Sequence, residues 1–352
     1  MANHFAQIII VLTVTGLVAG CEQQSESEAE PPRLEAAMVS AAMTGFMDYA
    51  LLQNQKSLVH VTQLGQLLTD FLETPTPDQQ QRIQQAWQAA HDTFLAGQLT
   101  FLVNRDNRQE LTFALDAWPI QAGFLDSLPG YPDSGLVNDV TVEISAAELR
   151  RQHGITDSEE VCLGFHAIEY LIFARPVADF IATGSGDTAA ELVLRRRQIL
   201  AAVATQLVLD SEQMSLLLEQ QADPAVEQNP FDQLLNLLQM LRHHLLAIVE
   251  KNSYEDPDFG HSVYTGSSST SLGTELTILK ALTLDQESLM SVFTVLNPTT
   301  AIHYESTLHD AIRLATQSDS DANQTTRLPL TLLALMHQFE EFETALEQRS
   351  AQ

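Results

Sequence analysis

Helical periodicity runs through this chain from about residue 34 almost to its end, and it limits the possible folds more than any other feature. Apolar residues recur three and four positions apart, which places them along one face of each helix. No two segments show the strict apolar–polar alternation that is typical of paired strands. We therefore expect an all-α protein, with helices near residues 34–74, 78–94, 110–117, 145–154, 159–174, 189–221, 230–249, 274–283, 285–313 (broken near 297–298) and 328–346.

The length of the chain suits two helical bundles, which we expect at residues 34–185 and 186–352. Residues 129–143 and 252–274 carry the turn-forming residues of irregular segments. Loops of such length in helical proteins are often functional, so the second of them is a candidate binding segment.

An apolar run near the start of the chain, Phe5 to Val18, has the length of a signal peptide and is short for a bilayer span. It ends in Val-Ala-Gly-Cys21, which resembles the lipobox of bacterial lipoproteins. The resemblance implies that residues 1–20 are removed and that Cys21 is acylated. It also implies an outer-membrane anchor facing the periplasm, with residues 21–33 as a disordered tether.

The charge of the chain excludes one class of partner and favours another. With 46 acidic and 17 basic residues the formal charge is -29, which repels nucleic acid and favours cations. The one basic run, Arg195 to Arg197, is expected to pair with neighbouring carboxylates. If Cys21 is acylated, Cys162 is the one cysteine left, and no internal disulfide is possible.

Two His-x-x-Glu spacings occur, and their surroundings separate them. His337 and Glu340 precede further acids and are expected on a solvated helix face. His166 and Glu169 stand in the apolar run Gly164–Phe173, which we expect in the middle of a helix that a capping box at 156–159 begins. Two ionisable groups in apolar surroundings form either a satisfied hydrogen-bonded pair or part of a metal site.

A metal site needs more ligands than this pair. One imidazole with carboxylate oxygens suits iron, with zinc or another divalent ion as alternatives. Asp116, beside the helix break at Trp118-Pro119, is the best further ligand. Cys162 lies one turn before His166 and is either a soft ligand or a small buried hydrophobe.

Other polar residues carry weaker signals. His91, Trp118 and Cys162 are possible cleft residues. For His91 the alternative is an exposed position on its helix, which is the commoner one for polar residues. The His243-His244 pair and the histidine and glutamate of His303-x-Glu305 are interpreted as surface residues.

Zinc peptidases require a different spacing. They place a second histidine in His-Glu-x-x-His or in the inverted His-x-x-Glu-His. Here Tyr170 stands where the inverted motif needs histidine. Whether the protein is an enzyme therefore stays open at this point.

The run Gly164-Phe-His-Ala-Ile-Glu-Tyr-Leu-Ile-Phe173, called the signature below, resembles the Gly-x-His-x-x-Glu signature of the imelysin family. Trp87 with Phe94, and Asp116-Ala-Trp-Pro119 ahead of the signature, resemble the family's order of landmarks. The resemblance implies two helical bundles with a cleft near the signature, export in bacteria, a role in iron uptake, and a peptidase label. His166, Glu169 and Asp116 match the family's metal residues, whereas His91 stands where many relatives have arginine.

Three hypotheses follow. The favoured one is a lipid-anchored periplasmic protein that binds iron through His166, Glu169 and Asp116 and that works with iron-uptake proteins. The alternatives are a metallopeptidase of the imelysin type and a metal-free envelope module that binds a partner through residues 252–274.

Overall fold

Long α-helices make up most of the computed structural model, and no strand occurs among the residues that it describes. These residues are 33–99, 105–182, 187–222, 229–251, 260–285, 287–316 and 322–350. The all-α expectation is confirmed. Within the described ranges, none of the helices is long and apolar enough to cross a bilayer. The predicted signal peptide, the tether up to residue 32 and Cys21 lie outside these ranges.

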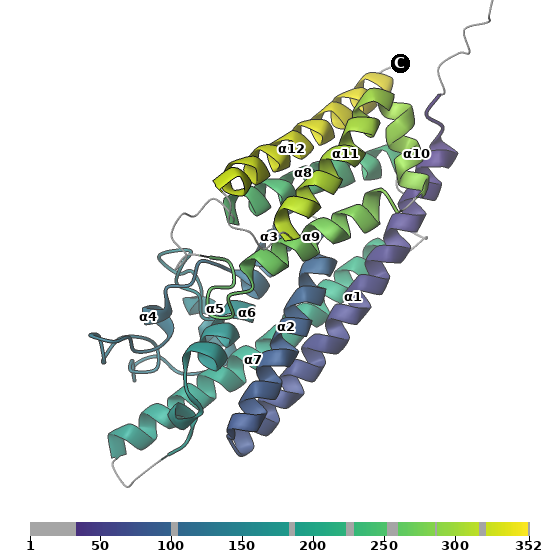
Figure 1. Cartoon of the computed structure of the whole chain (residues 1–352). Helices are drawn as coiled ribbons and strands as arrows, with labels where there is room; N and C mark the ends of the chain where they lie inside the picture. Colours follow the sequence, from purple (N-terminus) through teal and green to yellow (C-terminus); the bar gives the residue numbers. More distant parts are fainter. Residues whose placement is uncertain are drawn as a thin grey trace, which may run out of the picture. The chain divides into compact units, whose positions relative to one another are not determined.

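Three long helices, α1 (Ala36–Glu73), α2 (Pro77–Gln98) and α7 (Asp187–Gln221), lie side by side (Figure 1). Their contacts follow from the apolar periodicity, because α1 buries residues three or four positions apart from Val39 to Phe71. Helix α2 begins where Thr76 accepts a hydrogen bond from the Gln79 amide and Pro77 takes the first turn. Of the three, α2 carries a residue of the candidate site, His91.

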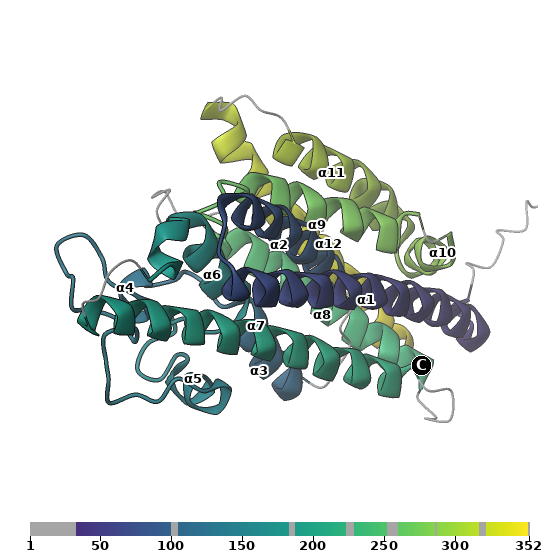
Figure 2. The same ribbon diagram turned by 90° about the horizontal axis from the view of Figure 1, so that it is seen from below.

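The second half of the chain packs against the other end of α1. Helices α8 (Pro230–Lys251), α9 (Ser268–Thr283), α10 (Glu287–Leu296), α11 (Pro298–Thr316) and α12 (Ala322–Ser350) contact one another, and α8 and α10 contact α1 (Figures 1 and 2). Residues 34–352 group into one compact unit. The expected division near residue 185 is not confirmed and stays a prediction.

Short elements fill the segment between α2 and α7, and two arginines of α7 bind the irregular stretches of this segment. The elements are α3 (Arg105–Asp116), α4 (Ala122–Leu125), α5 (Ala146–Gln152) and α6 (Gly164–Glu169). Arg196 pairs with the buried Asp126 at 2.5 Å, as the basic run led us to expect. Arg195 instead donates to four backbone carbonyls between residues 136 and 142, and Arg197 donates to the Leu72 carbonyl.

The helix that carries the signature differs from its prediction. It begins at Gly164, and a π-helical turn, Tyr170–Ala174, continues it, so the prediction of a mid-helix motif after a capping box was wrong. Thr156 bonds to the Glu160 carboxylate through its amide and its hydroxyl, which closes a turn instead of opening a helix. The signature histidine therefore lies in the first turn of its helix.

Gly164 is required where α6 meets the end of α3. Its φ is +77°, a left-handed conformation that other residues rarely adopt. A Cβ atom at this position would lie 2.3 Å from the Leu115 carbonyl oxygen and 2.6 Å from that of Ala114. The glycine lets the two backbones meet, and this contact brings the start of α6 to the C-terminal end of α3.

Replacement of this glycine tests the contact. We expect Gly164→Ala to lower the free energy of unfolding by more than about 3 kcal/mol, because φ strain and a backbone clash add together. The matched control is Gly130→Ala, where φ is +88° but nothing lies within 4 Å of the added Cβ. That control is expected to lose about 1–2 kcal/mol for the φ strain alone. Urea denaturation measures both, and equal losses would show that the close approach does not matter.

Candidate metal centre

Four buried side chains from four separate elements converge at the end of α3. They are His91 of α2, Asp116 of α3, His166 of α6 and His261 in the turn before α9, and one ligand-type atom of each lies within 4.8 Å of all the others. Each residue is at most 6% exposed. Water is largely excluded, so the polar atoms must bind one another or an ion.

Asp116 stands at the centre of the group. Its Oδ1 lies 3.1 Å from Nε2 of His91 and 3.1 Å from Nε2 of His166. Its Oδ2 lies 3.2 Å from Nε2 of His261, and the Nε2 atoms of His166 and His261 are 3.2 Å apart. Asp116 is the last residue of α3, and the cis peptide bond Trp118-Pro119 follows it.

His91 lies in the group and not on the surface, where the commoner explanation placed it. The buried face of α2 runs through Ile83, Trp87, Ala90, His91 and Phe94, so the histidine follows the tryptophan by one turn. Its ring stacks on Trp87 with centroids 4.7 Å apart. Trp87 in turn donates its indole N–H to the Phe165 carbonyl, which ties α2 to α6.

His166 is held between two carboxylates. Its Nδ1 lies 2.7 Å from Oε2 of Glu169, and its Nε2 faces Asp116. Burial alone would lower the pKa of His166, but hydrogen bonds to Asp116 and Glu169 and their charges outweigh it and raise the pKa to about 9. Without a metal, the ring is therefore protonated at neutral pH and bridges the two acids.

Glu169 lies behind His166 and is not one of the four converging residues. Its second oxygen, Oε1, accepts hydrogen bonds from the backbone N–H groups of Tyr264 and Thr265, each with an N···O distance of 3.0 Å. The carboxylate thus fixes the ring of His166 and also anchors the turn that carries His261. This position suits an orienting role better than the direct ligand role that the signature suggested.

His261 is the site residue that sequence reasoning missed. It lies in the predicted irregular segment 252–274, of which 252–259 fall outside the described residues. Its ring contacts His166, with centroids 4.6 Å apart, and the edge of Trp118 at 5.7 Å. No spacing in the sequence links it to the signature, because the contact is made by a turn almost a hundred residues later.

The remaining candidates lie elsewhere. Cys162 is not a member of the group: its thiol donates to the Leu149 carbonyl at 3.2 Å, and burial raises its pKa to about 12. His337 and Glu340 are exposed, as predicted, and so are His303 and Glu305.

The interpretation of His244 as a surface residue was wrong. Its side chain is 11% exposed, and its Nε2 lies 2.6 Å from Oε2 of Glu275. The neighbouring His243 is exposed, as expected.

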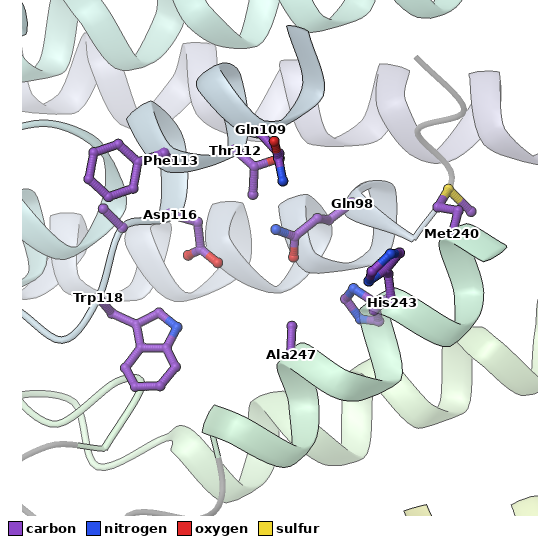
Figure 3. Close-up of a pocket in the computed structure, with 11 residues that line it drawn as sticks. Gln98, Gln109, Thr112, Phe113, Asp116, Trp118, Met240, His243 and Ala247 are labelled. Atoms are coloured by element: carbon purple, nitrogen blue, oxygen red, sulfur yellow. The ribbon is translucent and has the colours of Figure 1, made fainter. Parts of the chain in front are cut away.

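A cavity of about 430 Å³ adjoins the centre. Asp116 projects toward it from the end of α3 beside Trp118, and His243 and Ala247 project from α8 on the other side (Figure 3). Its wall is completed by Gln98, Gln109, Thr112, Phe113, Ala117, Met240 and His244. The Asp116 carboxylate is therefore accessible through this cavity.

The donor set suits a transition-metal ion. Ligands about 2.1 Å from an ion at tetrahedral angles are about 3.4 Å from one another. The four closest separations here are 3.1–3.2 Å, so small movements of the side chains would accommodate an ion. Three imidazoles and one carboxylate suit iron, zinc and similar divalent ions.

Comparisons with known proteins agree with this architecture. The family model described as imelysin, which carries a peptidase designation, matches residues 50–346. Iron-regulated protein A of Synechococcus elongatus is 23% identical over 216 residues, which are 61% of this chain and 50% of that protein. The chain thus spans about half the length of this curated relative.

Two solved structures share the fold. A structure described as an iron-regulated protein A precursor from Parabacteroides distasonis gives a TM-score of 0.66 at 13% identity, over 90% of this chain and 96% of the other. An imelysin-like protein from Psychrobacter arcticum gives 0.59 at 14% identity, with the same coverage.

The raised pKa of His166 predicts how the stability of the metal-free protein depends on pH. The folded-state pKa of about 9 exceeds the unfolded value of about 6.5, so the stabilisation is fully present below pH 6.5 and is lost as pH rises through 9. The loss is on the order of 2–3 kcal/mol. Urea denaturation in the presence of a chelator at pH 6.5, 7.5 and 9.5 measures it. His166→Gln should show a flatter profile, and an unchanged slope in this variant would contradict the assignment.

Proposed function

The chain belongs to the imelysin family, and we propose that it binds a transition-metal ion, iron, at the Asp116 centre for uptake or scavenging. The observation that carries the proposal is the convergence of three Nε2 atoms on one buried carboxylate. His91, His166, His261 and Asp116 would hold the ion. A formal charge of -29 favours the approach of cations to such a site.

Glu169 supports this assignment from outside the group. An imidazole that donates its Nδ1 proton to a carboxylate keeps Nε2 free for an ion and becomes a more basic ligand. His166 has this arrangement, because Nδ1 bonds to Glu169 and Nε2 faces the group. The signature thus supplies one ligand together with the residue that orients it.

The choice of iron rests on the names of similar proteins and not on the donor atoms. The Synechococcus protein and the Parabacteroides structure carry iron-regulated names. Imidazole and carboxylate donors also suit zinc and manganese, so both ions belong in the test.

A peptidase reaction has no comparable support. Its base would have to be Glu169, but in this structure the carboxylate is bound to His166 and to two backbone amides of the 260–265 turn. The turn brings His261 to the centre, which gives part of the 252–274 segment a role other than partner binding.

We further propose that the protein is exported and anchored through acylated Cys21 in the outer membrane, facing the periplasm, where it works with iron-uptake proteins. The lipobox-like Val18-Ala-Gly-Cys21 supports this. In bacteria fed radiolabelled palmitate, the wild-type protein should carry label in the membrane fraction. The Cys21→Ser variant should lack this label, and equal labelling of the two proteins would contradict the proposed anchor.

Metal titration tests the central proposal. The chelator-stripped protein is dialysed anaerobically against ferrous iron, and separately against zinc and manganese, and the bound metal is measured. We expect a tight iron site that His166→Ala weakens at least 100-fold, because a ligand is lost, and that Glu169→Gln weakens by about 10- to 100-fold.

The exposed pair His337 and Glu340 provides matched controls with the same spacing. His337→Ala and Glu340→Gln should bind iron as the wild type does. Unchanged affinity in both His166→Ala and Asp116→Asn would overturn the assignment, and a clear preference for zinc would replace iron with that ion.

A further inference from the structure

We propose that the cavity beside the centre is a binding site for a small organic amine, whose ammonium group would lie between Asp116 and Gln98. The cavity holds about 430 Å³, which is within the range of small-molecule sites. At about 30 Å³ each, about 14 water molecules occupy that volume, which limits the ligand to about the same number of non-hydrogen atoms. The proposal goes beyond metal binding and does not depend on it.

An unpaired hydrogen-bond acceptor in the wall indicates which kind of ligand group would fit. Oε1 of Gln98 is shielded from solvent, and no residue in the described ranges donates a hydrogen bond to it. Figure 3 shows the amide of Gln98 directed into the space between Asp116 and His243. The terminal torsion of a glutamine side chain is soft, so a small rotation presents this oxygen to a ligand. An N–H donor of the ligand would satisfy it.

The charged groups of the wall favour a cation over an anion. Among the described residues that line the cavity there is no lysine or arginine, and Asp116 is its one carboxylate. His166 shares a single positive charge between Asp116 and Glu169, so the two acids are not fully neutralised. An ammonium group in the cavity is attracted by the remaining negative charge, and a carboxylate on the ligand would be repelled by it.

The rest of the wall suits the organic part of such a ligand. Aromatic, thioether and methyl surfaces line the cavity, and they come from Phe113, Trp118, Met240 and Ala247. A hydrocarbon group gains free energy when it is buried against such surfaces, whereas a hydrated metal ion does not. Trp118 also stands two residues from Asp116, and an indole ring attracts ammonium groups. The cavity therefore combines an apolar wall with polar groups at one place.

Benzylamine is the probe, because it joins an ammonium group to a small aromatic body. Benzyl alcohol and benzoate carry the same ring with no charge and with a negative charge. At pH 8 and in the presence of a chelator, we expect calorimetry to find one benzylamine site with a dissociation constant of about 1 mM or lower. The alcohol should bind at least tenfold more weakly, and benzoate should not bind. Equal binding of amine and alcohol, or no saturable binding of the amine, would overturn the proposal.

Two substitutions test whether the amine binds in the cavity. Ala247→Phe fills the space from α8 and should weaken benzylamine binding at least tenfold, whereas Leu246→Phe, at an exposed neighbouring position, should not. Gln98→Met keeps the length of the side chain and removes the acceptor, so a loss of at least tenfold is expected. Gln85, exposed on the same helix, provides the control Gln85→Met. Unchanged affinity in both cavity variants would contradict the site.

Circular dichroism melts check that each variant folds. If the cavity variants do not fold, a crystal structure of the wild-type protein with benzylamine decides: electron density for the amine beside Asp116 supports the site, and its absence from the cavity overturns it. None of these measurements uses a metal ion. The failure of the amine site would therefore leave the proposed iron site unaffected, and the failure of the iron site would leave the amine site unaffected.

Discussion

The site depends on the contacts between the Asp116 carboxylate and the histidines around it. The carboxylate faces the Nε2 atoms of three histidines that come from α2, α6 and the turn before α9. A buried carboxylate is costly unless it is paired, so each imidazole that reaches it offsets the cost of desolvation. The elements around it are arranged to allow this: Gly164 admits the start of α6 to the end of α3, and Glu169 holds the turn of His261.

The sequence was enough to predict the helical architecture, because apolar periodicity is a local signal. The ends of α1, α7 and α8 lie within about three residues of their expected positions, as does the break between α10 and α11 at Pro298. The start of α6 was not predictable in the same way. Its position depends on the contact of Gly164 with the Leu115 carbonyl, which lies far away in the sequence.

The residues of the candidate site also divide into those that local sequence features predict and those that they do not. His166 and Asp116 stood out because an apolar run and a helix break surround them, and these are local features. His91 was visible in principle, since it follows Trp87 by one turn on the buried face of α2. His261 was not, because a backbone contact between the Tyr264 amide and Glu169 brings it to the centre. A side chain that a turn brings to the site in this way can be recognised from the tertiary structure but not from a local sequence pattern.

At the proposed centre, a proton and a metal ion would compete for Nε2 of His166. In the metal-free protein, the acids on either side of His166 raise its pKa and keep the ring charged, with Nε2 directed at Asp116. An ion bound at the proposed centre would take the place of that proton at Nε2 and would leave the bond from Nδ1 to Glu169 in place. The two carboxylates that favour the proton also favour a cation of higher charge. The two carboxylates therefore stabilise positive charge at His166, which explains how four ionisable side chains stay buried together.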